Sequence, residues 1–338
     1  MNQQIINIVN NALSEDAVRS DITTRILIPE DFNIHAEIVS KDKGVVCGLS
    51  IARLAFKLLD KNIKFVPNFK DGEAVKKGEV LAAIYGKARA ILSAERTALN
   101  LLAHLSGIAT LTNEFVKKVK PYKSKILDTR KTTPNLRLLE KYAVRCGGGG
   151  NYRFDLSGQI LIKDNHIQAA SRKPPACPAG RQATSLKEII EKARKKAKGK
   201  KIEIEVDNLS QFKEALAASP DIIMLDNFKP SDIKKAVKIK NRSPVTRPTP
   251  QRGCPESPVK LEASGGITLK NVKKIASCGV DFISIGALTM YQAALDNQTN
   301  SILKFLSIAA TLALPLNVVV GFYGMNISLP FQEYSNSW

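Results

Sequence analysis

Residues 202–227 read IEIEVDNLSQFKEALAASPDIIMLDN, and this stretch decides the fold class. Two short apolar runs, at 202–206 and 222–227, flank a stretch at 209–219 with helical character. A strand, a helix and a second strand in this order predict a βαβ unit within a parallel sheet. Further apolar runs have the same character: ILDT (126–129), ILIKD (160–164), KLEASGG (260–266) and FISIG (282–286).

Every one of these predicted strands ends in a polar residue or a glycine. These residues are Asp128, Lys163, Glu205, Asp226, Ser264 and Gly286. A closed α/β barrel forms its active face at the C-terminal ends of its strands, and an open doubly wound sheet binds ligands at the same ends. The periodicity does not separate the two architectures, but both predict a functional site beside these residues.

The chain before about residue 114 has a different organisation. The stretch DGEAVKKGEVLAAIYG (71–86) alternates short strands with Asp-Gly and Lys-Gly turns. Residues 88–119 then carry an apolar stripe at helical spacing: Leu92, Leu99, Leu102, Leu105 and Ala109. Arg96 falls off this stripe. Because 338 residues suggest about two domains, we expect one α/β domain at 1–113 and a second at 114–289.

The charge of the chain is concentrated in the second predicted domain. Basic residues exceed acidic ones by 20 overall and by 19 within residues 114–288. Such a field attracts polyanions, either nucleic acid or small phosphorylated and carboxylated substrates. The basic run KARKKAKGKK (192–201) has no interleaved aromatic residue. We therefore interpret it as a solvated helix end and expect no nucleic-acid partner.

Composition and cysteine content limit the class of protein. A hydrophobic content of 44% excludes a disordered or collagen-like chain. The five cysteines are odd in number and include no C-x-x-C, which argues against a disulfide framework and a zinc ribbon. The N-terminus lacks the basic flank and apolar core of a signal peptide. We expect a cytoplasmic location.

Two stretches interrupt the βα pattern, and a third follows it. Residues 168–185 and 240–258 are rich in Pro, Arg and Ser, and we interpret both as loop insertions. Residues 290–338 form an apolar extension that has no charged residue between 305 and 332. A segment at 305–325 is long enough to cross a bilayer and to anchor the chain; the alternative is a buried core helix.

The stretch 127–167 gathers cations around a run of four glycines, Gly147 to Gly150. The cations are Arg130, Lys131, Arg137, Arg145, Arg153 and Lys163. Arginine forks match carboxylates and phosphates, and glycine allows a ligand to approach the backbone closely. The stretch predicts an anion site; the alternative is a set of surface cations around a flexible turn.

Carboxylates and glycines at the other strand ends suit the remaining parts of an anionic substrate. Glu205 and Asp226 end successive strands and could hold Mg²⁺ with a phosphate, or ribose hydroxyls; the alternative is an ion pair with a neighbouring lysine. In EASGGITLKNV (262–272), backbone N–H groups and a following helix N-terminus predict a phosphate site. Gly286 would close the same site.

Together these motifs resemble those of the quinolinate phosphoribosyltransferases. The matching runs are DITT (21–24), ERTALNLLAHLSGIATLT (95–112), DTRKTTPNLRLLEKYAVRCGGGGNYRFDLS (128–157), IKDNHI (162–167), IEVD (204–207), IIMLDN (222–227), EASGGI (262–267) and SIGALT (284–289). The resemblance implies an N-terminal α/β open-faced sandwich and an incomplete α/β barrel. It implies a pentosyltransferase of NAD biosynthesis that joins quinolinate to 5-phosphoribosyl 1-pyrophosphate, with Mg²⁺, giving nicotinate mononucleotide, pyrophosphate and CO₂.

The resemblance also assigns roles to individual residues. The substrate-binding set is Arg96, Thr129, Arg130, Lys131, Tyr152, Arg153, Lys163, Glu205, Asp226, Ser264, Gly265, Gly266, Ile285, Gly286 and Ala287. Within it, the resemblance gives catalytic roles to Lys131, Lys163, Glu205 and Asp226, the last two also facing the metal. Arg96 would reach into the neighbouring subunit's site, which implies a homodimer or a larger homo-oligomer. Tyr152 stands where the family commonly has histidine, and a phenol cannot carry positive charge.

The C-terminal extension resembles a different family. Residues 300–327 are similar to the first membrane helix of CorA-type magnesium transporters, including their G-M-N signature at 324–326. Those transporters also need a second membrane helix and a large cytosolic domain, so we expect no ion conduction. A fusion, a sequence artefact and a membrane anchor all fit this extension. The rival functions are a related phosphoribosyltransferase acting on another anionic base, and a membrane-associated fusion protein.

Overall fold

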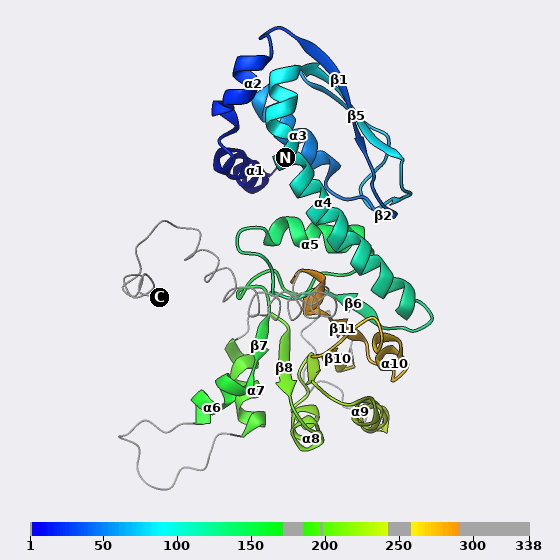
Figure 1. The fold of residues 1–338 in the computed structure, drawn as a ribbon. Coiled ribbons are helices and arrows are strands. Elements are labelled where there is room, and N and C mark those ends of the chain that lie inside the picture. The colour runs from blue at the N-terminus through cyan, green and yellow to red at the C-terminus, as the bar shows by residue number, and fades with distance from the viewer. Residues whose placement is uncertain (1, 172–184, 197–198, 243–257, 291–338) are drawn as a thin grey trace, which may run out of the picture. The chain divides into compact units, whose positions relative to one another are not determined.

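The computed structural model describes residues 2–171, 185–196, 199–242 and 258–290 (Figure 1). The N-terminal half contains α1 (Gln3–Glu15), η1 (Val18–Ser20), α2 (Ile22–Leu27), β1 (Asn33–Val39), β2 (Gly44–Val45), α3 (Leu49–Leu59), β3 (Lys64–Pro67), β4 (Ala74–Val75), β5 (Val80–Lys87) and α4 (Ala88–Val119). β1, β5 and β3 form one antiparallel sheet, and β2 pairs with β4.

One face of the three-stranded sheet is uncovered. Along β1 the side chains alternate between exposed and more buried positions, as expected when only one face packs on a core. His35 pairs with Tyr85 on β5, and the two rings stack 4.5 Å apart on side chains that remain accessible. This sheet and its flanking helices are the open-faced sandwich that the family resemblance implied.

Helix α4 runs without a break through the predicted boundary at residue 113. It packs against α3 in the N-terminal half and against α5 (Arg137–Cys146) in the second half. Leu102, Leu105 and Ala109 are buried as predicted, but Leu92 is 42% exposed, so the stripe does not begin there. The division into 1–113 and 114–289 therefore falls inside a helix and stays a prediction.

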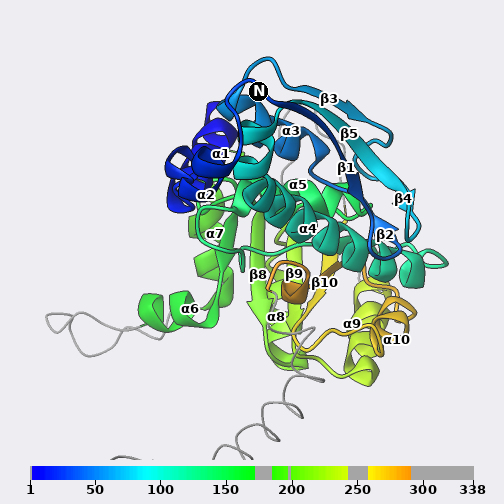
Figure 2. The same cartoon turned by 45° about the horizontal axis from the view of Figure 1, so that its top comes forward.

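The second half contains a six-stranded parallel sheet. Its strands are β6 (Lys125–Leu127), β7 (Ile160–Ile162), β8 (Ile202–Val206), β9 (Ile222–Asp226), β10 (Lys260–Ser264) and β11 (Phe282–Ser284). From β7 to β11, each strand pairs with the next strand of the chain, and β11 then pairs with β6. The order across the sheet is therefore β6-β11-β10-β9-β8-β7. Because the strand order does not reverse, this is a barrel and not a doubly wound sheet. The described strands β6 and β7 are not paired with each other, so the barrel is incomplete; Figure 2 shows β8, β9 and β10 side by side.

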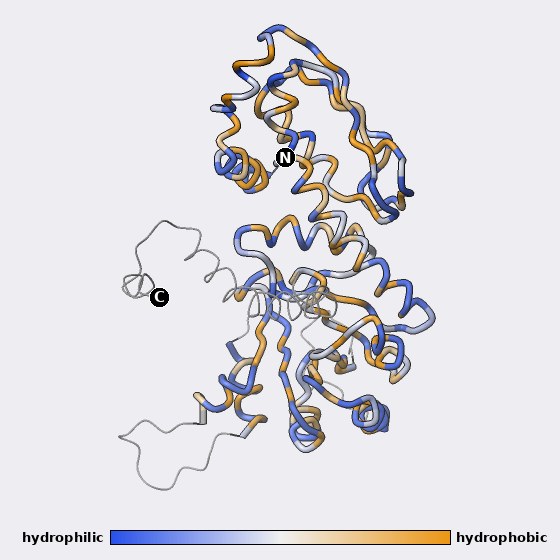
Figure 3. The backbone as a smooth tube through the Cα atoms, in the orientation of Figure 1, coloured by the Kyte–Doolittle hydropathy of each residue, from blue (hydrophilic) through white to orange (hydrophobic). Residues whose placement is uncertain are grey.

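Helices connect the barrel strands in the manner of βαβ units. They are α5, α6 (Asp164–Ser171), α7 (Leu186–Lys196), α8 (Leu209–Ala217), α9 (Pro230–Arg242) and α10 (Val272–Ala276). The short η2 (Gly286–Leu288) follows β11. Figure 3 shows hydrophilic and hydrophobic residues alternating along these flanking helices. Lys192, Lys195 and Lys196 are exposed at the end of α7, which confirms the solvated helix end for the described part of that basic run.

The strand register fixes which side chains point into the barrel. Glu205 on β8 pairs with Met224 on β9, and Met224 pairs with Glu262 on β10. Side chains of paired residues share a face, and alternation along a strand adds Glu203 and Ser284 to that face. Ile204 on β8 lies on the opposite face. The barrel interior is therefore unusually acidic below its strand ends.

The two predicted insertions begin later in the chain than the sequence predicted. α6 extends to Ser171 and α9 to Arg242, so the expectation that 168–171 and 240–242 are loop was wrong. The prolines begin only beyond these residues, and both helices end before them. Residues 172–184 and 243–257 lie outside the described residues, as does the segment 305–325 with its membrane and core alternatives. Among the described helices none is long and apolar enough to cross a membrane.

Candidate functional site

The polar residues predicted from the strand ends lie along one edge of the barrel sheet. Thr129, Arg130 and Lys131 follow β6, Lys163 follows β7, and Glu205 and Asp226 are in β8 and β9. Ser264 ends β10, and Gly286 follows β11. Since the strands are parallel neighbours, their C-terminal ends meet at this edge. The structure thereby brings the barrel members of the predicted site together.

Lys163 and Glu205 form the ion pair of this edge. Lys163 Nζ lies 2.8 Å from Glu205 Oε2, with the lysine side chain 45% and the glutamate side chain 14% exposed. Asp226, on the next strand, accepts a hydrogen bond of 2.7 Å from the side chain of Asn227. The ion-pair alternative for Glu205 is thus what the structure contains, and it leaves a partly exposed cation beside two carboxylates.

Arg130, after β6, and Arg153, in the loop before β7, each have a buried nitrogen atom without a partner among the described residues. Nε of Arg130 and Nε of Arg153 are buried, and no described residue accepts a hydrogen bond from either. Nη1 of Arg153 donates to the backbone oxygen of Gln159 at 2.8 Å. Buried guanidinium N–H groups normally find an acceptor. Their orientation therefore suits an anionic ligand.

Tyr152 connects this edge to the acidic interior of the barrel. Its hydroxyl donates to Glu203 Oε2 at 2.7 Å, and the side chain of Gln159 donates to the same oxygen at 2.6 Å. The ring of Tyr152 also lies 5.8 Å from the guanidinium carbon of Arg153. Burial and the negative charge of Glu203 raise the pKa of Tyr152, so the phenol stays protonated. Tyr152 is placed to support Arg153 as well as to line the site.

Glu203 and Glu262 are fully buried below the site. Glu262 accepts a hydrogen bond from the hydroxyl of Ser284, while one oxygen of each glutamate lacks a donor among the described residues. Burial raises the pKa of Glu203 well above its usual range and that of Glu262 to about 7. Neither Glu203 nor Glu262 was predicted to have a role in the site. The alternation E-x-E in β8 was the available signal.

Asp128 directly follows β6 and has its partners within the protein. Its carboxylate is fully buried and pairs with Lys141 of α5. It also accepts hydrogen bonds from the side chain of Asn151 at 2.6 Å and from the backbone N–H of Tyr152 at 2.7 Å. Burial raises the pKa of Asp128 and lowers that of Lys141. Unlike the other predicted strand ends, Asp128 is thus occupied by Lys141 of α5.

Helix α5 also holds the loop that carries Arg130 and Lys131. Glu140, which is fully buried, accepts from the backbone N–H of Thr133 at 3.1 Å and lies 2.9 Å from His104 of α4. Nε of Arg137 donates to the hydroxyl of Thr132 at 3.0 Å. Arg137 therefore stabilises the loop that follows β6. Arg145 lies in the last turn of α5.

Two of the four consecutive glycines, Gly147 and Gly149, allow close packing of the chain against α4 and α5. A Cβ at Gly147 would lie 2.4 Å from the backbone oxygen of Ala109, and one at Gly149 would lie 2.8 Å from both Thr112 and Val144. These atoms belong to α4 and α5. Packing therefore explains the lack of a side chain at these two positions, and the approach of a ligand to the run as a whole stays a prediction.

The glycines after β10 are suited to a ligand. Gly265 has φ +88°, and a Cβ there would lie 2.2 Å from the side-chain oxygen of Asn227. Gly266 has φ +58°, and a Cβ there would meet no atom within 4 Å. Successive N–H groups in such a turn can form an anion nest. Helix α10 begins only at Val272 and has five residues, so the expected helix N-terminus does not adjoin this turn.

The loop after β11 completes the same edge. A Cβ at Gly286 would lie 3.0 Å from the side chain of Lys131, so this glycine leaves room for the lysine. Thr289 donates to the backbone oxygen of Lys131 at 2.6 Å. Ile285 is buried, and its N–H donates to Leu127. Its side chain and N–H are thus used within the protein.

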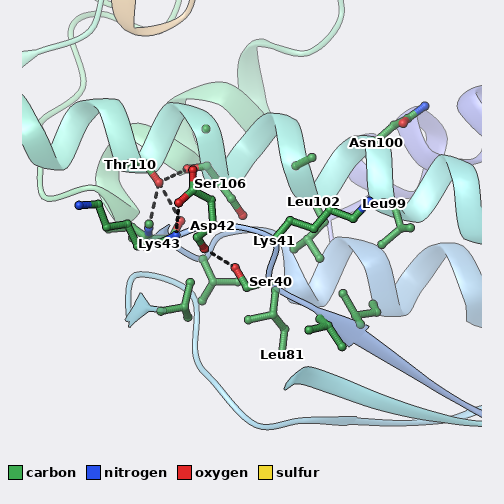
Figure 4. Close-up of a pocket in the computed structure, with 18 of the residues that line it drawn as sticks. Ser40, Lys41, Asp42, Lys43, Leu81, Leu99, Asn100, Leu102, Ser106 and Thr110 are labelled. Carbon is green, nitrogen blue, oxygen red and sulfur yellow. Dashed lines mark hydrogen bonds between the residues drawn. The ribbon is translucent and has the colours of Figure 1, made fainter. Parts of the chain in front are cut away.

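Arg96 lies away from these residues in the chain's own fold, exposed on α4. It lines a cavity of about 440 Å³ between α4 and the loop from Ser40 to Lys43 (Figure 4). A second cavity, of about 430 Å³, contains Arg96 together with Asp16, His104 and Leu136. Neither cavity contains the residues at the strand ends.

Comparison with known proteins identifies this arrangement. A family model described as quinolinate phosphoribosyl transferase, C-terminal domain, matches residues 108–299, and the model of the N-terminal domain matches residues 21–106. The chain belongs to the quinolinate phosphoribosyltransferase family. It is 41% identical over 293 residues to a probable nicotinate-nucleotide pyrophosphorylase (carboxylating) of Bacillus subtilis, covering 87% of this chain and 92% of that protein.

Other members of the family agree in sequence and in structure. The nicotinate-nucleotide pyrophosphorylase (carboxylating) of Mycobacterium leprae is 37% identical over 294 residues, covering 85% of this chain and 94% of that protein. The solved enzyme of Francisella tularensis has a TM-score of 0.74 and 39% identity, covering 86% of this chain and 92% of that chain. The resemblance inferred from the motifs is confirmed, and so are the predicted enzyme class and fold.

The C-terminal extension matches a separate family model. The model described as CorA-like Mg²⁺ transporter protein matches residues 287–338. All but the first four of these residues lie outside the described part of the chain. The similarity predicted from the sequence is therefore present in the comparison, and the anchoring role of residues 305–325 stays a prediction.

Proposed function

We propose that this chain transfers the phosphoribosyl group of 5-phosphoribosyl 1-pyrophosphate to quinolinate and releases pyrophosphate and CO₂, forming nicotinate mononucleotide. The observation that carries the proposal is the pair of buried Nε atoms of Arg130 and Arg153 that lack an acceptor among the described residues. Arg130 follows β6, Arg153 lies in the loop before β7, and Lys163 follows β7. Such a set suits a ligand with two carboxylates, because arginine binds carboxylates in a forked geometry.

The quinolinate carboxylates would lie among Arg130, Lys131, Arg153 and Lys163, with Thr129 and Tyr152 lining the site. Lys163 is paired with Glu205 at 2.8 Å and is still partly exposed. An incoming carboxylate would compete with Glu205 for the ammonium group. Binding would thus free a glutamate oxygen for the second substrate. The positive field of this half of the chain would favour both anionic substrates.

The 5′-phosphate would occupy the turn formed by Ser264, Gly265 and Gly266, closed by Gly286 and Ala287. Gly266 supports this placement because the space beside its Cα is open. Ile285 would hold the loop after β11 in place, since its side chain is buried and its N–H donates to the backbone oxygen of Leu127. Phosphate binding at such a turn uses fixed N–H groups and requires no charged side chain.

Glu205 and Asp226 would face the ribose and Mg²⁺. The described residues contain no group of three acidic, histidine or cysteine side chains suited to a metal. Two carboxylates with substrate phosphates are nevertheless a usual donor set for Mg²⁺, so the residues fit the ion. Mg²⁺ would neutralise the departing pyrophosphate. The two carboxylates would also stabilise positive charge at C1, so catalysis would depend mainly on positioning and electrostatics.

The protein partner in this proposal is a second copy of the chain. Arg96 is exposed on α4, and we propose that it enters the site of a second copy in a homodimer. A cytoplasmic location remains part of the proposal. Nicotinate is one rival base. A human nicotinic acid phosphoribosyltransferase has 14% identity to this chain and a TM-score of 0.54, which shows a likeness of fold alone.

The test is formation of nicotinate mononucleotide from quinolinate, 5-phosphoribosyl 1-pyrophosphate and Mg²⁺ by the full-length chain. Equimolar nicotinate serves as competitor. Product that requires quinolinate supports the proposal, whereas product from nicotinate alone favours the rival phosphoribosyltransferase. Fractionation of the full chain and of a version ending at residue 290 tests the anchor. If both versions are equally active and neither sediments with membranes, anchoring is excluded.

A further inference from the structure

Two cysteines from the two halves of the described chain lie against each other. Cys47 follows β2 and is fully buried, whereas Cys146 is the last residue of α5 and is partly exposed. The interaction between the two thiols raises the pKa of Cys47 and lowers that of Cys146. Both are free thiols in this structure. Nothing in the proposed reaction uses either residue.

Backbone contacts on one side hold the cysteines together. The N–H of Gly72 donates to the backbone oxygen of Val46, the residue before Cys47, at 2.8 Å. A Cβ at Gly72 would lie 3.3 Å from the backbone oxygen of Cys146. The same glycine therefore touches the chain beside one cysteine and the backbone of the other.

Asp71 provides a second, independent link. Its Oδ1 accepts from the N–H of Gly48 at 2.9 Å and of Leu49 at 3.0 Å, directly after Cys47. Its Oδ2 accepts from the hydroxyl of Tyr142 at 2.6 Å. Tyr142 lies four residues, about one helical turn, before Cys146 on α5. The proximity of the two thiols thus follows from the packing of the two halves.

We propose that Cys47 and Cys146 are a redox modification site, at which a hydroperoxide converts the two thiols into a disulfide. Cys146 is the attacking residue because it is the accessible one. Cys47 resolves the intermediate because it is buried beside Cys146. The third described cysteine, Cys278, lies elsewhere in the barrel half. The site is separate from Arg130, Arg153 and the strand ends.

The two steps balance in atoms and electrons. The Cys146 thiolate attacks one peroxide oxygen, the O–O bond breaks, and hydroxide or an alkoxide leaves with the bonding electrons. The sulfur of Cys47 then attacks the sulfenic acid of Cys146, the S–O bond breaks, and the S–S bond forms. The proton of Cys47 leaves with hydroxide as water. The thiols lose two electrons, and the peroxide gains them.

The surroundings of Cys146 favour the first step. Its pKa is lowered to about 7 by the hydrogen bond from Cys47, aided by Tyr142 and Arg145, against the opposing effect of burial. Roughly half of this thiol would be thiolate at pH 7. The pKa of Cys47 is raised by the same hydrogen bond and by burial. The pair therefore divides into a reactive thiolate and a protonated resolving thiol.

The test treats the full-length protein with hydrogen peroxide and maps the cysteines by peptide mass spectrometry. We expect a peptide pair joining Cys47 to Cys146 with the loss of two hydrogen atoms, reversed by dithiothreitol. The bond would raise Tm by roughly 5 °C, because it closes a loop of about 100 residues. Disulfides that instead involve Cys177, Cys254 or Cys278 would overturn the proposal, as would retention of both free thiols.

Single variants separate the two roles. Cys47→Ser should accumulate a sulfenic acid at Cys146 that dimedone traps, whereas Cys146→Ser should leave Cys47 unoxidised. Cys278→Ser is the matched control, because this buried cysteine lies elsewhere in the barrel half and should leave the disulfide yield unchanged. Equal dimedone labelling of Cys47 and Cys146 in the two variants would contradict the assignment of roles.

Discussion

Tyr152 donates its phenolic hydrogen to Glu203 over 2.7 Å, from the edge of the candidate site into the barrel. The same glutamate oxygen accepts from the side chain of Gln159, whose backbone oxygen holds Arg153. The ring of Tyr152 lies beside that arginine as well. Glu203 therefore anchors two of the groups that orient Arg153.

Tyr152→Phe tests this anchor. The ring remains, but the buried oxygen of Glu203 loses a donor, which we expect to cost about 1–3 kcal/mol of unfolding free energy. Arg153 should also lose orientation, so KM for quinolinate should rise several-fold more than KM for 5-phosphoribosyl 1-pyrophosphate. Steady-state kinetics and urea unfolding measure both effects. Tyr85→Phe, on the open face of the sandwich, is the control; equal KM changes for both substrates would count against the anchor.

Arg130→Ala tests the assignment of the anion site. A charge-assisted pair contributes about 1.5–3 kcal/mol, so KM for quinolinate should rise roughly 10- to 100-fold. Tm should change little, because the buried Nε has no protein acceptor to lose among the described residues. The matched control is Arg53→Ala on α3, which is exposed. An unchanged KM and kcat would exclude Arg130 from the site.

Gly265→Ala and Gly266→Ala distinguish strain from ligand contact. At Gly265 a Cβ would collide with Asn227, so we expect more than about 2 kcal/mol of destabilisation. At Gly266 only the positive φ opposes alanine, at about 1–2 kcal/mol. The methyl group at Gly266 should instead raise KM for 5-phosphoribosyl 1-pyrophosphate. If both variants lose equal stability and neither affects that KM, the turn is not the phosphate site.

Lys141→Met tests the buried ion pair with Asp128. Methionine retains much of the volume but leaves a buried carboxylate without its cation, so we expect a loss of about 3–5 kcal/mol. The double variant Lys141→Met, Asp128→Leu should recover part of this loss. Thermal unfolding of the wild type, of Lys141→Met, of Asp128→Leu and of the double variant gives the coupling energy. Strictly additive effects would show that the two residues do not support each other.

Glu262→Gln tests the acidic interior through pH. Burial raises the pKa of Glu262 to about 7 from an ordinary 4.5, with Ser284 and Glu203 opposing the rise. The folded protein therefore binds more protons than the unfolded chain between these values, and stability falls as pH rises through this window. Glutamine does not titrate, so the variant does not lose this stability. As pH rises through the window, the unfolding free energy of the variant relative to that of wild type should rise by at most about 1.4 kcal/mol per pH unit. A pH-independent difference between pH 4.5 and 7 would contradict the raised pKa.

The sequence predicted the barrel strands well because each is a short apolar run ended by a polar residue or a glycine. IEIEV and IIMLDN became β8 and β9, and their ends lie at the site edge as expected. Closure of the barrel was not readable from periodicity, since it depends on β11 pairing with β6 far away in the chain. It was first inferred from the family resemblance.

Roles that depend on tertiary partners were predicted less well. Asp128 has the same strand-end position as Asp226, but α5 covers it with Lys141. The glycine run has the composition of a ligand loop, yet α4 occupies the space beside Gly147. Tyr152 was recognised as a departure from the family, whereas its bond to Glu203 could not be read from residue spacing.

The continuity of α4 has an evolutionary consequence. The two family models meet between residues 106 and 108, and α4 spans Ala88–Val119 with buried residues from end to end. A recombination event at that junction would cut the helix and expose an apolar face on each fragment. The two halves are therefore expected to be inherited as one unit, and shuffling of either half onto another fold would need a breakpoint outside this helix.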